Sequence, residues 1–364
     1  MKAIAVFPKE KKVALVDHPE PKIELPQQVK LKMLEVGVCG TDREICQFKY
    51  GEPPAGSDYL ILGHESLGQV IEVGSGVTSL KPGDLVVPMV RRPCPSKTCT
   101  ACRAEQQDFC YTGDFKERGI KRLHGFMAEY VVDEEKYMVQ VPNELRDFAV
   151  LTEPLTIAEK AVREIYFVQK RLPWENNPSR FALIIGAGPV GLLAAVVFRA
   201  RAFHTTVYSL EAATDKRAEI ATALGANYVS AKTTSLDALV KLIPGNLDVI
   251  FDGSGASELA FRMTKLLGYN GVFVWTGIPG KKEPIDLNAG TMMQDLVLKN
   301  QSIIGSVNAG RYDFQRAVSA LQGLVDNFRR LPHPLITHFG IEHYADLLLK
   351  PVTPDIFKSV IQFS

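Results

Sequence analysis

Two groups of side chains in this sequence have the types and spacing of metal ligands. The first is a run of four cysteines, Cys94, Cys99, Cys102 and Cys110, in a stretch rich in proline, serine and threonine. Four thiolates match the closed tetrahedral coordination of structural zinc, which leaves no position for a substrate. We therefore expect this run to hold a structural zinc that orders an irregular lobe. A disulfide-linked loop is the alternative, and it belongs to oxidising compartments.

The second group is scattered along the first half of the chain and consists of Cys39, His64 with Glu65, and Glu153. One cysteine, one histidine and one carboxylate make three protein ligands, and a catalytic zinc keeps its fourth position open for water or substrate. Such a zinc acts as a Lewis acid that lowers the pKa of a hydroxyl group. Thr41, two residues after Cys39, is placed to relay the proton. We therefore predict a catalytic zinc site, with Cys39, Thr41 and His64 as catalytic residues.

A third motif has the form of a dinucleotide-binding loop. It contains Gly186, Gly188, Pro189, Val190 and Gly191, between an apolar run and a stretch of small, apolar residues. In such a loop the first glycine permits a tight turn, the second lets the backbone approach a pyrophosphate, and the third lets the helix pack against the strand. The amides at the helix N-terminus then face the phosphates. The motif predicts a nicotinamide dinucleotide as cofactor.

The choice between NAD and NADP is expected to depend on Glu211. This residue lies 20 positions beyond Gly191, at the end of the next predicted strand. A carboxylate there accepts hydrogen bonds from the ribose hydroxyls of NAD and repels the 2′-phosphate of NADP. NAD is therefore the preferred cofactor in this prediction. Lys216 and Arg217 follow closely enough to reach a phosphate, which keeps NADP possible.

The elements around these motifs indicate two domains of an α/β protein. Up to about residue 149, short β-branched runs punctuated by proline and glycine predict a β-rich domain, and a helical pattern over 153–170 follows it. Beyond residue 180, strands alternate with helices as in a doubly wound parallel sheet, with strands at 181–185, 206–210, 227–230, 248–251, 271–275 and 302–305. We assign residues 1–170 and 310–364 to a catalytic zinc-binding domain and residues 171–309 to a dinucleotide-binding domain.

Composition restricts the classes of partner. The 364 residues are 46% hydrophobic and 23% charged, and 42 basic against 41 acidic residues give a net charge of +1. The sequence has no long run of one charge, so we expect neither a nucleic-acid-binding surface nor a polybasic surface for membranes. No stretch of 18 apolar residues and no signal-like start are found, so we expect no membrane span and a cytoplasmic location. A small, near-neutral ligand fits this composition.

The segment Gly63-His64-Glu65-x2-Gly68-x5-Gly74-x2-Val77 resembles the zinc alcohol dehydrogenase signature of the medium-chain dehydrogenase/reductase superfamily. Within that superfamily the sequence is most similar to the archaeal-type glucose (aldose) 1-dehydrogenases. The segments that carry this similarity are Cys39-Gly40-Thr41-Asp42-Arg43-Glu44-Ile45, Arg91-Arg92, Asp108-Phe109-Cys110-x-Thr112-Gly113, Gly125-Phe126-Met127-x-Glu129 and Val307-Asn308.

The resemblance implies a GroES-like catalytic domain and a Rossmann domain, and the oxidation of an aldose such as glucose to its lactone with NAD(P). It implies a catalytic zinc held by Cys39 and His64, with Glu65 and Glu153 as alternating or outer ligands. It places a sugar site near Thr41, Asp114, Glu153 and Asn308, with Asn308 also beside the cofactor. It further implies a homo-oligomer, a dimer or tetramer, paired through the sheet edge around 271–306.

Three positions depart from the pattern of the glucose enzymes. Val90 replaces an asparagine, Asp114 replaces a glutamate, and Ile157 replaces an acidic residue. Because a site without polar partners for hydroxyl groups loses discrimination, a polyol, amino-alcohol or simple alcohol dehydrogenase of the same superfamily is an alternative. A non-catalytic nucleotide-binding protein is a second alternative, and the joint presence of a complete ligand set and Thr41 argues against it.

Overall fold

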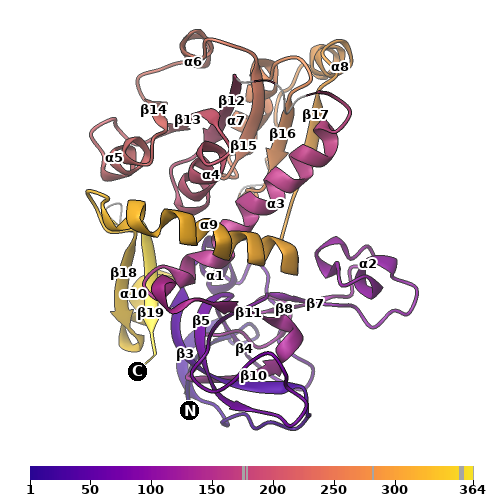
Figure 1. The fold of residues 1–364 in the computed structure, drawn as a ribbon, viewed down its shortest axis with the longest axis vertical. Helices are drawn as coiled ribbons and strands as arrows, with labels where there is room; N and C mark the ends of the chain where they lie inside the picture. The colour runs from indigo at the N-terminus through magenta and orange to yellow at the C-terminus, as the bar shows by residue number, and fades with distance from the viewer. Residues whose placement is uncertain (174–176, 178, 281–282, 352–355, 364) are drawn as a thin grey trace. The chain divides into compact units, whose positions relative to one another are not determined.

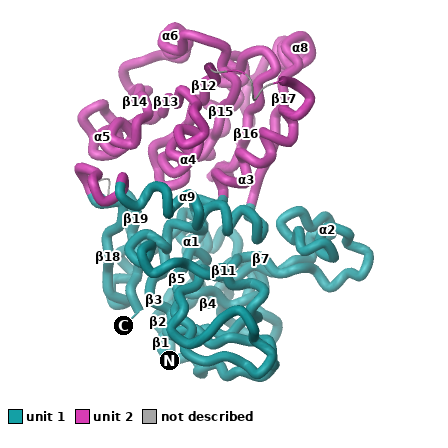
Figure 2. The backbone as a smooth tube through the Cα atoms, in the orientation of Figure 1, with its two compact units in different colours: residues 1–156, 308–326, 334–364 teal, residues 157–307, 327–333 magenta. Residues whose placement is uncertain are grey.

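The computed structural model describes residues 1–173, 177, 179–280, 283–351 and 356–363 (Figure 1). The chain divides into two compact units, of which unit 1 comprises residues 1–156, 308–326 and 334–364, and unit 2 comprises residues 157–307 and 327–333 (Figure 2). The first division lies inside helix α3 (Thr152–Gln169) rather than after residue 170, as the sequence analysis places it. Residues 327–333 belong to unit 2, not to the unit expected for 310–364. The first of these boundaries lies inside α3, and the second segment begins inside helix α9 (Arg311–Arg329) and continues beyond its end at Arg329.

Unit 1 is built mainly from β-sheets. Its largest sheet has the order β11-β6-β5-β3-β19-β18, with β10 also paired to β3. The strands of this sheet are β3 (Gln28–Gly37), β5 (Glu65–Val73), β6 (Leu85–Pro88), β10 (Tyr130–Glu134), β11 (Met138–Val141), β18 (Ile336–Gly340) and β19 (Lys358–Gln362). One smaller sheet contains β1 (Lys2–Phe7), β2 (Lys12–Asp17) and β4 (Leu60–Ile61). Another contains β7 (Arg91–Arg92), β8 (Lys116–Arg118) and β9 (Arg122–Leu123).

Short helices connect these strands. They are α1 (Gly40–Cys46), α2 (Thr100–Arg103) and α10 (Tyr344–Leu349), with the 3₁₀ turns η1 (Gln107–Phe109), η2 (Glu135–Tyr137), η3 (Asn143–Leu145), η4 (Ala149–Leu151) and η7 (Ile341–His343). The core of the unit contains fully buried side chains such as Leu31, Met33 and Phe126. Helix α9 (Arg311–Arg329) begins in this unit. The C-terminal strand β19 then pairs antiparallel with β3, so the last segment returns to the first unit.

Unit 2 is a parallel sheet with the order β14-β13-β12-β15-β16-β17. The strands are β12 (Arg180–Ile185), β13 (Phe203–Ser209), β14 (Asn227–Ser230), β15 (Leu247–Asp252), β16 (Val272–Trp275) and β17 (Ser302–Gly305). The helices are α4 (Pro189–Arg199), α5 (Lys216–Ala223), α6 (Leu236–Leu242), α7 (Ser257–Met263) and α8 (Ala289–Leu298), with the turn η6 (Thr264–Leu266).

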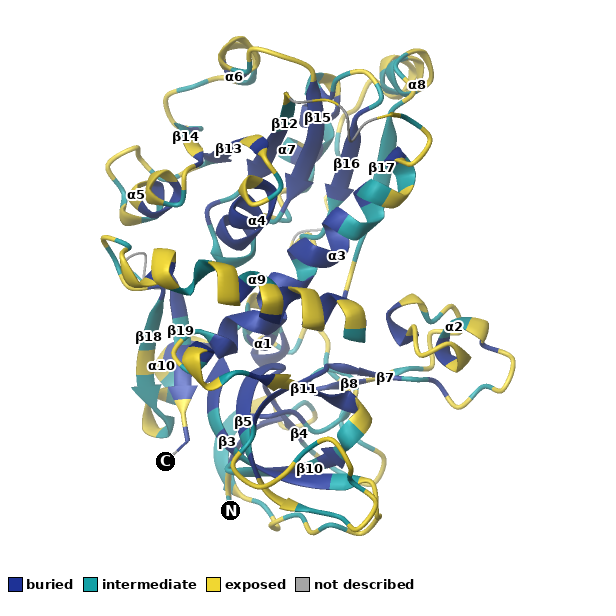
Figure 3. Cartoon of the chain, viewed as in Figure 1, coloured by how far each residue is buried: buried dark blue, intermediate teal, exposed yellow. Residues whose placement is uncertain are grey.

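This order reads 3-2-1-4-5-6 along the chain, which is the doubly wound arrangement of dinucleotide-binding domains and confirms the predicted fold. Figure 3 shows the central strands and α4 as buried, as expected of a parallel sheet covered on both faces. Among the helices of the described ranges, none has the length and apolar character required to cross a membrane.

Candidate functional site

Three potential metal ligands meet in unit 1. Cys39 is the residue that caps the N-terminus of α1, Glu65 is the first residue of β5, and His64 immediately precedes it. The thiol, the imidazole and the carboxylate offer ligand atoms that all lie within 4.8 Å of one another, and His64 and Glu65 are buried. One sulfur, one nitrogen and one oxygen are the donors of a three-ligand catalytic zinc site. The residues present therefore fit the predicted ion.

Asp42 orients this cluster, although the sequence analysis gives it no role. Its buried carboxylate accepts hydrogen bonds from the backbone N–H of Cys39 at 2.9 Å and of Gly63 at 3.2 Å, which ties α1 to the segment before β5. The same group lies 3.4 Å from His64 Nδ1. A carboxylate beside one ring nitrogen fixes the tautomer and leaves the other nitrogen for a metal. Burial lowers the pKa of His64, but the charges of Asp42 and Cys39 outweigh it and raise that pKa well above its usual value.

Glu65 is paired with Lys358, which comes from β19 at the other end of the chain. Both side chains are buried, and Lys358 Nζ also donates a hydrogen bond to Val38 O at 3.1 Å. Burial opposes the positive charge of Lys358, but the charge of Glu65 outweighs it and raises the pKa of the ammonium. Nothing in the local sequence around Lys358 points to this position, because the contact depends on the pairing of β19 with β3.

Glu153 stands in the first turn of α3 and is buried. It does not join the 4.8 Å cluster that Cys39, His64 and Glu65 form within the described ranges. Burial raises the pKa of Glu153 to about 7, while the charge of His64 opposes this shift and the charge of Glu65 adds to it. The carboxylate is therefore close enough to interact electrostatically with the cluster. This placement suits an outer or exchanging ligand better than a permanent one.

Thr41 lies in the first turn of α1 and is half-buried. Burial raises the pKa of Tyr50, and a hydrogen bond with the Thr41 side chain opposes that shift. The Tyr50 hydroxyl in turn donates to Glu44 Oε2 at 3.0 Å. A chain of polar groups thus runs from Thr41 to a partly exposed carboxylate. Sequence reasoning identifies Thr41 but misses Tyr50 and Glu44, since neither has a ligand-like spacing.

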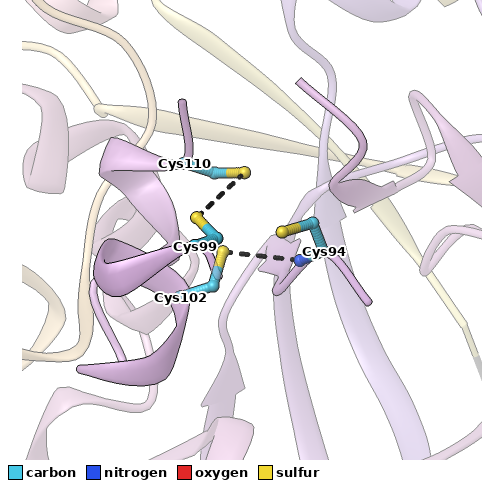
Figure 4. Close-up of side chains that lie close together, drawn as sticks. All are labelled: Cys94, Cys99, Cys102 and Cys110. Carbon is cyan, nitrogen blue, oxygen red and sulfur yellow. Dashed lines mark hydrogen bonds between the residues drawn. The ribbon is translucent and has the colours of Figure 1, made fainter. Parts of the chain in front are cut away.

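The four cysteines of the lobe converge on one another (Figure 4). Their sulfur atoms all lie within 4.8 Å, and all four side chains are free thiols rather than disulfides. The backbone N–H of Cys94 donates to Cys102 Sγ at 3.4 Å. Burial opposes ionisation of Cys110, but hydrogen bonds with Thr112 outweigh it and lower the pKa of the thiol to about 6. Four converging thiols fit a closed structural zinc site.

The dinucleotide loop between β12 and α4 has the geometry that its glycines predict. Gly186 adopts a φ of +96°, which side chains rarely tolerate. A Cβ added at Gly188 would meet open space, so a ligand can approach the backbone there, whereas one added at Gly191 would overlap Gly186 O. Pro189 is the first residue of α4, and Val190 follows in its first turn. Each glycine thus takes the position expected for pyrophosphate binding.

Glu211 lies two residues beyond the end of β13, and its side chain is 23% exposed and has two partners. It accepts a hydrogen bond from the Ser209 hydroxyl and forms an ion pair with Arg217, whose Nη1 lies 2.9 Å from Oε1. Burial raises the pKa of Glu211, but the Ser209 hydrogen bond and the Arg217 charge outweigh it and lower that pKa. The carboxylate is therefore ionised but its charge is largely balanced, which weakens its predicted rejection of a 2′-phosphate.

The predicted substrate contacts Asn308 and Asp114 belong to polar networks in unit 1. Asn308 is buried at a φ of +60°, and its Nδ2 donates to Glu117 Oε1 at 3.0 Å. That same oxygen accepts from Arg91 Nε at 3.0 Å. Asp114 is exposed and pairs with Arg122 Nη1 at 2.6 Å. Both contacts with substrate stay predictions, and Glu117 is a neighbour of Asn308 that the sequence analysis does not identify.

Comparison with known proteins identifies relatives along the whole chain. A family model described as alcohol dehydrogenase GroES-like domain matches residues 25–143, and one described as glucose dehydrogenase C-terminus matches residues 146–363. A glucose 1-dehydrogenase of Methanocella arvoryzae is 41% identical over 327 residues, which cover 89% of each chain. A glucose 1-dehydrogenase of Thermoproteus tenax is 40% identical, over 100% of this chain and 99% of that relative.

A solved structure is also similar to this one. It is the glucose dehydrogenase of Haloferax mediterranei in complex with NADP, Zn and gluconolactone. Its sequence is 29% identical, the TM-score is 0.88, and the match covers 100% of this chain and 99% of that one.

Proposed function

This chain belongs to the glucose dehydrogenase family, and from that premise we propose that it oxidises the C1 hydroxyl of an aldose to the lactone with a nicotinamide cofactor. The observation that carries the proposal is the convergence of Cys39, His64 and Glu65 in a chain that also has a complete dinucleotide loop. The relative of known structure holds gluconolactone, the oxidised product of such a reaction.

Cys39, His64 and a carboxylate of Glu65 or Glu153 would hold the catalytic zinc, which supplies a Lewis acid that makes the substrate hydroxyl more acidic. In the reaction, the C1 hydrogen leaves with its electron pair for the nicotinamide ring, and the hydroxyl proton leaves separately. Asp42 keeps His64 in one tautomer throughout. We assign the first proton transfer to the Thr41 hydroxyl, and its contact with Tyr50 supports a route to Glu44 and solvent.

Both dinucleotides are proposed as cofactors. Glu211 can accept hydrogen bonds from the ribose hydroxyls of NAD, whereas Arg217 can turn toward the 2′-phosphate of NADP. The ion pair between these two side chains favours neither strongly. The Haloferax relative holds NADP. This finding supports the use of NADP by this chain, whereas Glu211 alone supports the use of NAD.

The sugar itself is tested by a panel of aldoses, polyols, amino alcohols and simple alcohols, assayed with each cofactor. We expect the highest kcat/KM for an aldose. Val90 is a buried apolar residue, where the sequence resemblance leads us to expect an asparagine, and this departure favours a polyol dehydrogenase as the second candidate. Higher kcat/KM for a polyol than for every aldose would replace the first proposal with the second.

We also propose a cytoplasmic homo-oligomer. Six free thiols suit a reducing compartment. Strand β17 forms one edge of the unit 2 sheet, and its residues Ile303 and Ile304 are only half-buried in the single chain. An apolar sheet edge is a common pairing surface between subunits. Light scattering should give the mass of a dimer or tetramer, and Ile303→Lys should reduce that mass; a monomeric wild-type protein would contradict the proposal.

A further inference from the structure

A buried ion pair lies against the metal-ligand cluster, and the steps proposed above do not use its cation. The side chains of Lys358 and Glu65 are 3% and 2% exposed. Removing two charges from water is costly, and a buried pair of this kind is often no more stabilising than apolar side chains of similar volume. Stability alone therefore does not account for an ammonium group beside a potential metal ligand.

The lysine fastens together the two segments that carry the ligands. Besides its contact with Glu65, its Nζ donates to Val38 O at 3.1 Å, immediately before Cys39. The next residue of β19, Ser359, accepts a hydrogen bond from Val38 N at 2.9 Å. β19 thus contacts both the backbone of Val38, next to Cys39, and the side chain of Glu65, next to His64.

Space for the pair is provided by a glycine. A Cβ added at Gly37, on β3, would lie 2.8 Å from Lys358 Cε and would overlap the Glu65 carboxylate. Gly37 does not have a positive φ, so backbone conformation does not require a glycine there. The residue instead leaves room in which the two side chains meet. The backbone, the glycine and the lysine together restrict where the Glu65 carboxylate can go.

This restriction matters because the site has more carboxylates than a three-ligand centre needs. Glu65 lies in the cluster, and Glu153 lies outside it but interacts with the charges of His64 and Glu65. If both bound the metal with Cys39 and His64, four protein ligands would close the coordination sphere, as the four cysteines do in the lobe. An ammonium group bonded to Glu65 competes with a metal ion for the same oxygen atoms.

We propose that Lys358 is a positioning residue that restrains the Glu65 carboxylate, so that Glu65 and Glu153 do not bind the metal at the same time and one position stays open for the substrate oxygen. The inference rests on the proposed function in one respect, because it takes the ion of this cluster to be catalytic. It does not depend on which sugar or cofactor is used.

The test is a double-mutant cycle of K358M and E65Q, with the affinity for zinc measured by competition with a chelator. Most partners of metal ligands support metal binding, and their loss costs about 10- to 100-fold in affinity or activity. Because Lys358 instead competes with the metal for Glu65, K358M should bind zinc more tightly, by about 10-fold, the lower end of that range. Its KM for the sugar should rise, with kcat/KM lowered about 10- to 100-fold. In the E65Q background, K358M should change neither quantity, since the released carboxylate is then absent.

A matched control is provided by Lys30, a buried lysine at the other end of β3 that is paired with Glu20. K30M should leave zinc affinity unchanged. If K358M does not fold, K358Q takes its place, because its amide fills similar volume without the charge. Cobalt(II) spectra supply an independent readout: bands that shift on addition of sugar in wild type should no longer shift in K358M.

The outcomes separate the inference from the proposed function. An unchanged zinc affinity in K358M, or an equal increase with and without Glu65, would overturn the inference, since the lysine would then act as a distant charge or not at all. If the zinc affinities of the double-mutant cycle are as expected but no sugar is oxidised, the proposed substrate is wrong and the restraint on Glu65 still stands.

Discussion

Asp42 explains how one residue can organise a site whose ligands are far apart in the sequence. Its carboxylate accepts from the backbone at Cys39 and Gly63 and faces His64. The Cys-Gly-Thr-Asp spacing places it at the third helical position, where an acidic side chain can accept a hydrogen bond from the capping residue. That signal is local and readable in the sequence. Its second contact, with the segment before β5, is not.

At Thr41, replacement by valine removes the hydroxyl at nearly constant shape. We expect Thr41→Val to lower kcat about 10²- to 10⁴-fold, the usual contribution of a positioned proton-transfer group, with the zinc content unchanged. Tyr50→Phe should lower the rate less, because water can replace the more distant group. Stopped-flow rates with a C1-deuterated sugar and metal analysis check both variants. An unchanged rate for Thr41→Val, under conditions where hydride transfer is limiting, would exclude this threonine from the relay.

The prediction for Arg217 concerns cofactor choice. Arg217→Ala removes a cation that can meet the 2′-phosphate of NADP and leaves Glu211 with its full charge. Since a hydrogen bond to a charged group contributes about 1.5–3 kcal/mol, we expect kcat/KM with NADP to fall about 10- to 100-fold relative to that with NAD. The exposed neighbour Lys216 serves as the matched control, and Lys216→Ala should have a smaller effect. Equal losses with both cofactors would show that Arg217 only supports the loop.

At the level of elements, the cysteine lobe is expected to depend on its metal. Its regular structure consists of α2 and η1, and its buried core is made of cysteines. Because a closed zinc site contributes folding free energy, Cys99→Ser should release one zinc per chain and lower the melting temperature before it affects the hydride step. Metal analysis, calorimetry and limited proteolysis of the lobe test this. A variant that keeps its zinc and stability but loses turnover would contradict the structural role.

A buried ionic network holds β7, β8 and β10 together. Asp133 accepts from Arg92 at 2.5 Å and Arg118 at 2.6 Å. Burial opposes ionisation of Asp133, but the charges of the two arginines outweigh it and hold its pKa well below the usual range. The resulting stabilisation is fully present above the unfolded pKa, about 4, and is lost as the pH falls below that value toward the folded pKa.

We therefore expect Asp133→Asn to cost about 3–5 kcal/mol at neutral pH, because two buried arginines lose their counter-charge. Urea unfolding at pH 7 and pH 3 should show a large gap between wild type and variant at pH 7 and a smaller gap at pH 3. Asp17→Asn, which removes an exposed partner of Lys2, should change stability little. A constant gap at both pH values would mean that the charge of Asp133 is not what stabilises the network.

How far the sequence predicts an element depends on where its partners lie. The strands of unit 2 are predicted closely, because each is a short apolar run with turn residues on either side. β13 begins earlier than expected, at Phe203, since the polar residues His204 and Thr205 interrupt its pattern. The family resemblance is confirmed by relatives about 40% identical to this chain. By contrast, no local pattern in the sequence predicts a role for Lys358, because that role arises only when β19 is paired with β3.

At the scale of the whole molecule, the chemistry is divided between the two units. Cys39, His64, Glu65 and Glu153 all belong to unit 1, and the dinucleotide loop with Glu211 belongs to unit 2. The metal ligands come from segments next to β3, β5 and α3, whereas the phosphate site is formed at one β–α turn. The candidate metal ligands and the phosphate loop thus lie in different units. Loss of one set should therefore leave the binding properties of the other nearly intact.

This division leads to a reciprocal prediction. Cys39→Ala should abolish turnover and reduce the zinc content by one per chain, while the affinity for NADPH, measured by fluorescence titration, should stay within about 2-fold, a change of less than 0.5 kcal/mol. Conversely, Gly191→Val should abolish cofactor binding, because even a Cβ there overlaps Gly186 O, yet both zinc ions should remain. Full turnover in a Cys39→Ala protein shown to lack the catalytic metal would disprove the assignment of the site. Loss of cofactor binding in that variant would show instead that the metal ligands and the dinucleotide loop are coupled.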